Sequence, residues 1–153
     1  MKRIAMASIL TLFFAITFAL AGCADMAKEK WGKTVTLPND EVILDMSGEW
    51  DMRLEGYGPF SWLGIKSDIL TITQDGNTFT AVKQIGSKWV GKGAETIKGE
   101  LGKDGFKAVY QYIGAKAMDG SFAWEESKWE IRENGNKVML DSGDRIKTTL
   151  TRR

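Results

Sequence analysis

The sequence predicts an all-β protein whose folded part is an eight-stranded antiparallel up-and-down β-barrel. From about Val42 onward, apolar and polar residues alternate with a period of two, which is typical of half-buried strands. The alternating runs are separated by Asp-Gly and Asn-Gly turns, which are the strongest short-range hairpin signals. The chain after residue 23 shows no convincing apolar stripe at helical spacing. Period, turns and the lack of helical pattern together indicate a meander of hairpins.

The N-terminus carries an apolar segment that belongs to targeting rather than to the fold. "MKR" supplies two positive charges, and "IAMASILTLFFAITFALA" follows without any charge, as in a secretory signal. An uncleaved membrane anchor is the alternative, because a run of about 18 apolar residues approaches the ~20 that span a bilayer. "LAGC", Leu20 to Cys23, resembles the cleavage box of bacterial lipoproteins and contains the only cysteine of the chain.

This resemblance implies a lipoprotein signal peptide over residues 1–22 and acylation, for example with palmitate, at Cys23. Ala24, in place of aspartate, favours the outer membrane, so the resemblance implies a lipid-anchored protein of the bacterial cell envelope that faces the periplasm. Residues 23–41, which begin "CADMAKEKWGK", are expected to form a lipidated tether with at most a short helical turn. Residues 42–153 are expected to form the single β-barrel domain, which is a suitable length for one core.

The strands are expected, in order, at about 48–55, 67–74, 78–85, 94–101, 106–113, 121–131, 137–141 and 145–152. In the first strand Trp50, Met52 and Leu54 share the inward face. In the last strand the inward set is expected to include Ile146, Thr148, Leu150 and Arg152.

The alternation also predicts the inward faces of two strands in the middle of the chain. The alternation over 106–113 predicts that Phe106, Ala108, Tyr110 and Tyr112 face inward, and that Lys107 and Gln111 face outward. Over 121–131 the parity changes between Trp124 and Trp129, which predicts a one-residue bulge near Glu125–Lys128. Eight short strands of this kind remove their unpaired edges best by closing into a barrel.

The opening of the first strand and the close of the last resemble the lipocalins and related barrels. Gly48-x-Trp50 matches the signature of that family, Arg152 matches its terminal arginine, and Gly56–Lys66, "GYGPFSWLGIK", is expected to be the longest loop between strands and matches its lid. The resemblance implies that Trp50 plugs the closed end, that Gly48 allows a tight turn, and that Arg152 lies across the indole. It also implies a lid over an open mouth.

The aromatic residues have two interpretations, a ligand cavity or simply the core of a small barrel. Phe60 and Trp62 are the exception, because an apolar cluster on a loop either covers the mouth or binds a partner. The expected ligand-binding residues are Met52, Leu54, Phe60, Trp62, Phe79, Tyr110, Tyr112 and Trp124.

Composition argues against several classes of function. The chain has no histidine and its one cysteine is assigned to lipid, so no catalytic residue, metal site or cofactor is expected. With 21 basic and 20 acidic residues, two of the basic ones in the signal, the mature chain is close to neutral, which argues against nucleic acid despite the lysines around Trp89. Glu125 and Glu126 are neighbours on a strand and point to opposite faces, so they cannot act together as a glycosidase pair.

The function expected first is binding of a small hydrophobic ligand, of the lipid or fatty-acid class, inside a membrane-anchored barrel. The alternative is a protein-interaction module, an inhibitor or accessory subunit of an envelope complex, whose barrel core is solid. An enzyme is the least expected class. Interior volume separates the first two, because a cavity of about 300 Å³ or more favours a ligand.

Overall fold

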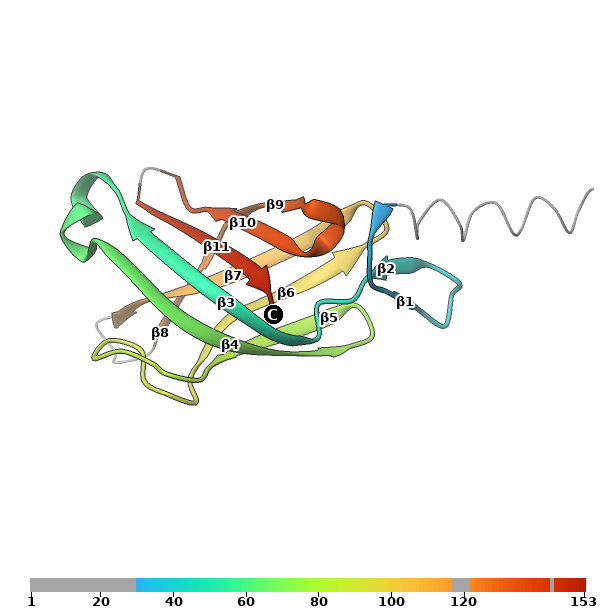
Figure 1. The fold of residues 1–153 in the computed structure, drawn as a ribbon, viewed down its shortest axis with the longest axis horizontal. Helices are drawn as coiled ribbons and strands as arrows, with labels where there is room; N and C mark the ends of the chain where they lie inside the picture. Colours follow the sequence, from blue (N-terminus) through green and yellow to red (C-terminus); the bar gives the residue numbers. More distant parts are fainter. Residues whose placement is uncertain (1–29, 117–121, 144) are drawn as a thin grey trace, which may run out of the picture.

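The computed structural model describes residues 30–116, 122–143 and 145–153 and, over these, an almost entirely β architecture (Figure 1). The expected signal peptide and Cys23 lie outside the described residues. Two antiparallel sheets are present, a large one of nine strands and a small one of two. The predicted all-β class is therefore confirmed.

The large sheet is a meander that curls into a nearly closed barrel, and its strands are β3 (Gly48–Gly56), β4 (Ile65–Asp75), β5 (Thr78–Lys83), β6 (Glu95–Gly102), β7 (Gly105–Lys116), β8 (Phe122–Glu126), β9 (Lys128–Arg132), β10 (Lys137–Asp141) and β11 (Ile146–Arg152). Their order across the sheet is β8-β7-β6-β5-β4-β3-β11-β10-β9, so consecutive strands are neighbours except β8 and β9, and the last strand, β11, pairs with the first, β3. The inward parity expected for β3 and β11 is confirmed, because Trp50, Met52, Thr148 and Leu150 are all buried.

The strand expected over 121–131 is instead two strands, so the large sheet has nine strands where eight were predicted. β8 ends at Glu126, β9 begins at Lys128, and the two lie at opposite edges of the sheet. Ser127, at the break, donates its backbone N–H to the Val109 carbonyl over 3.3 Å. The change of parity between Trp124 and Trp129 thus marks a real irregularity of the strand. The predicted bulge is wrong, because the strand is interrupted at this point instead.

The alternation of inward and outward side chains predicted for β7 fails after the first few residues of the strand. The register against β6 shifts between Glu100 and Leu101, so that Leu101 pairs with Phe106 but Glu100 pairs with Ala108. One extra residue in β7 reverses which side chains face inward directly beyond it, up to Gln111, whereas Tyr112 is buried as predicted. Gln111 is consequently buried, and Tyr110 lies on the outer face with 40% of its surface exposed.

One end of the barrel, called here the base, is closed by the N-terminal part of the described chain. β1 (Thr34–Thr36) and β2 (Val42–Leu44) form the small sheet, and Trp31, Ile43 and Leu44 are buried in the hydrophobic core. Gly32 donates its N–H to the Asn134 carbonyl over 2.6 Å, which ties this segment to η2 (Glu133–Gly135). The folded unit thus includes Trp31 and β1, within the stretch expected to be a tether.

The opposite end, called here the mouth, is covered by two connections (Figure 1). The first contains the 3₁₀ helix η1 (Gly58–Leu63) between β3 and β4, and the second is residues 84–94 between β5 and β6. The second is longer, so the prediction that the β3–β4 connection would be the longest is wrong. β5 stops at Lys83 because the chain is turned away there by hydrogen bonds to Asp68, described below.

Candidate functional site: a lidded cavity at the mouth of the barrel

At the base, the three residues assigned to barrel closure lie together. Trp50 is completely buried, its indole N–H donates to the Met46 carbonyl over 2.8 Å, and the guanidinium of Arg152 lies 4.4 Å from its ring centroid. Arg152 also donates to the backbone carbonyls of Asp45 and Ser47. Burial lowers the pKa of the Arg152 guanidinium, and the nearby Asp45 carboxylate opposes that effect. Gly48 has a φ of 115°, a conformation that a side chain would strain.

Above Trp50 the barrel interior is filled by side chains. This filled part ends at a buried hydrogen bond between two polar side chains, Gln111 and Thr148, which is called here the crossbar. Phe79 is 2% exposed and packs edge-on against Phe106, with ring centroids 5.8 Å apart. Gln111 donates its side-chain N–H to the Thr148 hydroxyl over 3.0 Å, and both side chains are buried. This bond crosses the interior between β7 and β11, which are not neighbours in the sheet. Leu54, which lies beside Thr148 across the β3–β11 ladder, belongs to the cavity above.

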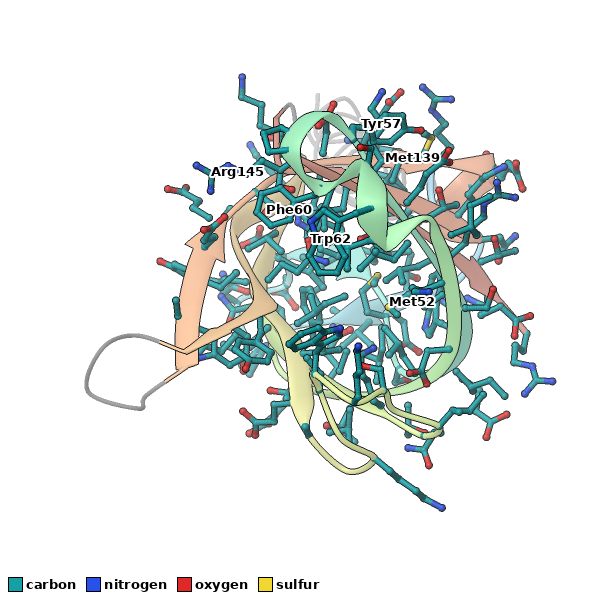
Figure 2. All side chains as sticks on the ribbon, turned by 90° about the vertical axis from the view of Figure 1, so that its left-hand side faces the viewer. Met52, Tyr57, Phe60, Trp62, Met139 and Arg145 are labelled. Carbon is teal, nitrogen blue, oxygen red and sulfur yellow. The ribbon has the colours of Figure 1, made fainter. Side chains whose placement is uncertain are left out.

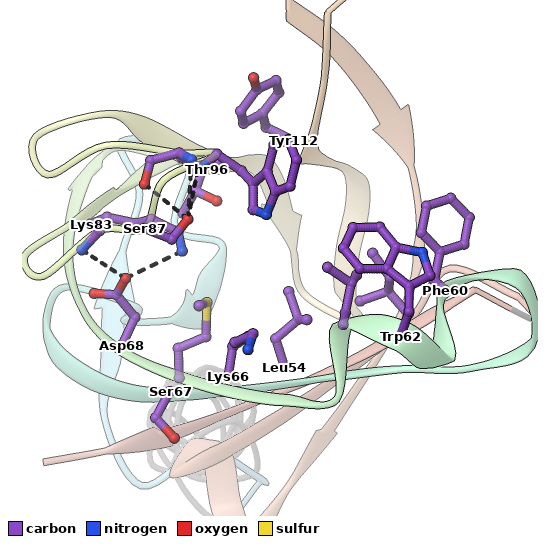
Figure 3. Close-up of a pocket in the computed structure, with 16 residues that line it drawn as sticks. Leu54, Phe60, Trp62, Lys66, Ser67, Asp68, Lys83, Ser87, Thr96 and Tyr112 are labelled. Carbon is purple, nitrogen blue, oxygen red and sulfur yellow. Dashed lines mark hydrogen bonds and ion pairs between the residues drawn. The ribbon is translucent and has the colours of Figure 1, made fainter.

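Between this crossbar and the two mouth connections lies a cavity of about 360 Å³ (Figure 3). Its lining is mainly apolar and aromatic, with a few polar groups on one side. The lining residues are Met52, Leu54, Phe60, Trp62, Leu63, Lys66, Ser67, Asp68, Lys83, Gly86, Ser87, Trp89, Val90, Thr96, Tyr112 and Ile146.

Five of the eight expected ligand-binding residues line this cavity, namely Met52, Leu54, Phe60, Trp62 and Tyr112. The other three lie elsewhere. Phe79 belongs to the core near the base, and Tyr110 points outward because of the register shift in β7. Trp124 is half-buried beside β6, where the Lys98 ammonium lies 4.2 Å from its ring centroid.

The lid has two halves that meet over the opening. Figure 2 shows Phe60 and Trp62 projecting from η1 across the mouth. Trp62 contacts Trp89 of the 84–94 connection edge to face, with ring centroids 6.1 Å apart and an interplanar angle of 72°. Gly56 lets η1 fold back this closely, because a Cβ at that position would lie 2.0 Å from the Phe60 carbonyl oxygen. The contact between the two indoles therefore joins the two mouth connections over the opening.

The polar side of the cavity is an ion pair that the sequence reading missed. The Lys83 ammonium lies 3.2 Å from the Asp68 carboxylate, and the side chains are 9% and 2% exposed. Both residues occupy inward positions of their strands. Asp68 lies on the same face of β4 as Leu70 and Ile72. Lys83 lies on the same face of β5 as Phe79 and Ala81. Opposite charges at inward positions of neighbouring strands were the signal that could have found them.

Asp68 organises the second half of the lid. Its carboxylate accepts the backbone N–H groups of Ile85 and Gly86, each over 3.0 Å. Burial by itself raises the pKa of this carboxyl, but the hydrogen bond from Ile85 and the charge of Lys83 outweigh it and hold the pKa below its usual value. Asp68 is therefore ionised and fully bonded, which suits a structural anchor better than a proton-transferring group.

A second hollow, of about 430 Å³, lies mainly against outward-facing side chains of the barrel wall. Asp51, Arg53, Lys137, Thr149 and Thr151 contribute to it, so its surface is polar and charged. Met52 is the one apolar side chain among its lining residues, so the cavity at the mouth is the stronger candidate site for a hydrophobic ligand.

Comparison of the chain with protein-family models, curated proteins and solved structures finds no match. Within the described ranges, no cluster of three or more potential metal-ligating side chains occurs. In the same part of the chain, no helix has the length and apolar character needed to cross a bilayer. The candidate site is thus defined by its own geometry, as an apolar cavity in a nearly closed antiparallel barrel.

Proposed function

We propose that this protein binds a small hydrophobic ligand, of the lipid or fatty-acid class, inside a lipocalin-like barrel. The observation that carries the proposal is the cavity of about 360 Å³, which lies in the volume range of small-molecule sites, ~300–1,000 Å³. Apolar walls would take up an acyl chain, and the lid aromatics Phe60 and Trp62 would separate it from water. No cofactor or catalytic step enters this proposal.

Titration of the protein with a fluorescent fatty-acid analogue tests this function. Saturable binding at micromolar concentration is expected, with a change in tryptophan emission, because Trp62 and Trp89 both line the cavity. Combined Phe60→Ala and Trp62→Ala substitutions should weaken binding by about tenfold or more, since each ring contributes buried apolar contact. Tyr110→Ala, which removes an aromatic ring from the outer wall, is the matched control and should bind as wild type.

A second candidate function, a protein-interaction module, is favoured by the exposure of Trp62 and Trp89, which are 65% and 54% exposed. Large apolar side chains on an exposed rim are typical of binding surfaces. If the protein shows no saturable binding to several lipid classes, the interaction module becomes the better supported of the two functions. Native mass spectrometry of the protein from its own membrane would then identify a co-purifying partner rather than a lipid.

We also propose that the chain is anchored in the outer membrane of a bacterial envelope through an acylated Cys23. The support is the "LAGC" sequence at the end of the apolar run. Labelling with a fatty-acid analogue should mark the wild-type chain and leave Cys23→Ser unmarked. Equal labelling of both would contradict the anchor.

A further inference from the structure

Exposed apolar side chains gather around the cavity opening. Trp62, Ile65, Ile85 and Trp89 are 65%, 53%, 61% and 54% exposed, and these four residues are called here the rim patch. They come from the two mouth connections and the first residue of β4, and the contact between Trp62 and Trp89 joins the two parts. Among the large apolar side chains that are exposed in the described ranges, only Tyr110 lies elsewhere, on the outer wall. Apart from Tyr110, the large exposed apolar side chains of the described ranges thus lie at one end of the barrel.

The segments that carry the rim patch are purely basic. Residues 57–67 and 84–94 contain Lys66, Lys88 and Lys92 and no aspartate or glutamate. The Lys88 ammonium lies 4.7 Å from the ring centroid of Trp89, so cation and indole are presented side by side. Of the two acids that directly follow these segments, Asp68 is buried and already neutralised by Lys83, whereas Glu95 is exposed. These two segments therefore combine aliphatic and indole groups with a net positive charge, in a chain that is close to neutral as a whole.

This combination matches the surface of an anionic bilayer. Indoles prefer the depth of the lipid headgroups, isoleucine side chains prefer the acyl boundary below, and ammonium groups pair with lipid phosphates above. Lysines near an anionic leaflet add attraction that decays within a Debye length, about 10 Å at 0.1 M salt. We propose that the rim patch with Lys66, Lys88 and Lys92 is a docking surface for an anionic lipid bilayer, which holds the cavity opening against the headgroups.

Docking in this orientation gives the cavity a direct route to lipid. The lid residue Trp62 belongs to both the cavity lining and the rim patch, so insertion of its indole into the headgroup region competes with its contact to Trp89. An acyl chain can then pass between bilayer and cavity without crossing bulk water. The docking surface goes beyond the proposed ligand binding and does not depend on it.

Vesicle binding tests the docking surface. The mature chain, residues 23–153 with Cys23→Ser so that no acyl chain contributes, contains the entire described core, from Trp31 to Leu150. It should co-sediment with vesicles that contain 30% phosphatidylglycerol in phosphatidylcholine, bind vesicles of pure phosphatidylcholine much more weakly, and dissociate in 0.5 M salt.

Two double variants separate the charged and apolar contributions. Lys88→Glu with Lys92→Glu should lower partition into the anionic vesicles by about tenfold or more. Ile65→Ser with Ile85→Ser should lower it similarly, because both side chains are exposed and neither lines the cavity. The matched controls are Lys103→Glu with Lys107→Glu, on the β6–β7 hairpin, and Tyr110→Ser on the outer wall; both should bind as wild type.

Each outcome decides the proposal. Equal binding of all variants, or equal binding to neutral and anionic vesicles, overturns it. Absence of vesicle binding, with a dimer that the Ile65→Ser and Ile85→Ser variant dissociates, overturns it in favour of an interface between two copies. Because Lys88 and Lys92 do not line the cavity, their variant should still bind the fatty-acid analogue in solution, so failure of docking and failure of ligand binding are observed separately.

Discussion

Trp50 and Arg152 illustrate how two residues at the ends of the barrel sequence hold it together. They are direct partners in the β3–β11 ladder, and the guanidinium lies over the indole. A cation over tryptophan contributes about 0.5–2 kcal/mol, and burial of the ring contributes more. The contact thus links the first strand of the barrel to its last at the point where the base is closed.

A double-mutant cycle measures this contact. Trp50→Ala is expected to lower the free energy of unfolding by about 3–5 kcal/mol, and Arg152→Ala by about 1–3 kcal/mol because two backbone carbonyls also lose their donor. The double variant should lose less than the sum, since contacting residues couple. Arg153→Ala should be nearly silent, because it removes exposed side-chain ion pairs with Glu49 and Asp51 and keeps the backbone hydrogen bond to the Glu49 carbonyl. Urea titrations of the four variants provide the values, and strict additivity would contradict the coupling.

Asp68 and Lys83 are expected to respond unequally to substitution, although they form one ion pair. Asp68→Ala removes the acceptor for Ile85 and Gly86 and leaves the Lys83 ammonium buried without its partner, which should cost about 3–5 kcal/mol of unfolding free energy. Lys83→Met keeps the volume, and Asp68 retains its backbone donors, so the loss should be smaller. Thermal unfolding of both variants distinguishes them, and equal losses would show that the ion pair itself dominates.

Acid should weaken the fold through the same carboxylate. The pKa values of Asp68 and Asp45 are held below their ordinary value of 3.8, so each contributes stability that is complete above that value and is lost as pH falls through the lower pKa of the folded state. The free energy of unfolding should therefore fall as pH drops below about 4. Asp68→Asn should show a shallower decline over the same range in urea titrations. Parallel curves for wild type and Asp68→Asn would rule out this contribution.

The 84–94 connection is the element whose shape is determined by backbone conformation. Gly86 has a φ of 80°, and a Cβ there would lie 2.2 Å from the Lys92 backbone nitrogen. A side chain at this position must displace the neighbouring backbone and with it Trp89, half of the lid. The connection is therefore held at Gly86 by conformation and at its start by the bonds to Asp68.

Gly86→Ala should accordingly loosen the lid, and Gly91→Ala in the same connection should not. No atom lies within 4 Å of a Cβ built at Gly91, and its φ is not in the left-handed region. We expect faster amide hydrogen exchange over residues 84–94 and altered tryptophan emission in Gly86→Ala, with Gly91→Ala unchanged. Identical exchange in the two variants would show that the lid does not depend on Gly86.

Across the whole molecule, base and mouth lie at opposite ends, and the N-terminal segment enters at the base (Figure 1). Only residues 24–30 separate Cys23 from Trp31, so they span at most about 25 Å when extended. Strands such as β4 or β7 reach about 35–40 Å. If Cys23 is acylated as proposed, entry of the short tether at the base favours an orientation in which the mouth faces away from the anchoring membrane and could dock on a second lipid surface.

Vesicle clustering tests this arrangement, which rests on both the anchor and the docking surface. The acylated chain, reconstituted into neutral vesicles, should cluster added anionic vesicles, measured by light scattering. Clustering should be lost with Lys88→Glu and Lys92→Glu and kept with Lys103→Glu and Lys107→Glu. If the acylated chain binds its own vesicles mouth-first, no clustering appears even when those vesicles are anionic.

The all-β class, the meander and the inward faces of β3 and β11 could be predicted from the sequence by itself. These features are local, because a period of two and a two-residue turn are set by residues adjacent in the chain. Part of the cavity wall followed from the same alternation, which identified Met52 and Leu54, while Phe60 and Trp62 followed from their place on a loop.

Only the tertiary structure decided the remainder. The extra residue in β7 turned Tyr110 outward and Gln111 inward. The change of parity between Trp124 and Trp129 was compatible with either a bulge or a strand break, and the tertiary structure has a break at Ser127. The partnership of Asp68 with Lys83, and of Trp62 with Trp89, joins residues whose separation in space depends on how the barrel curls. Period and propensity describe one strand at a time, whereas register and closure depend on the packing of strands against each other, so a single residue gained or lost in one strand changes which face every later side chain takes.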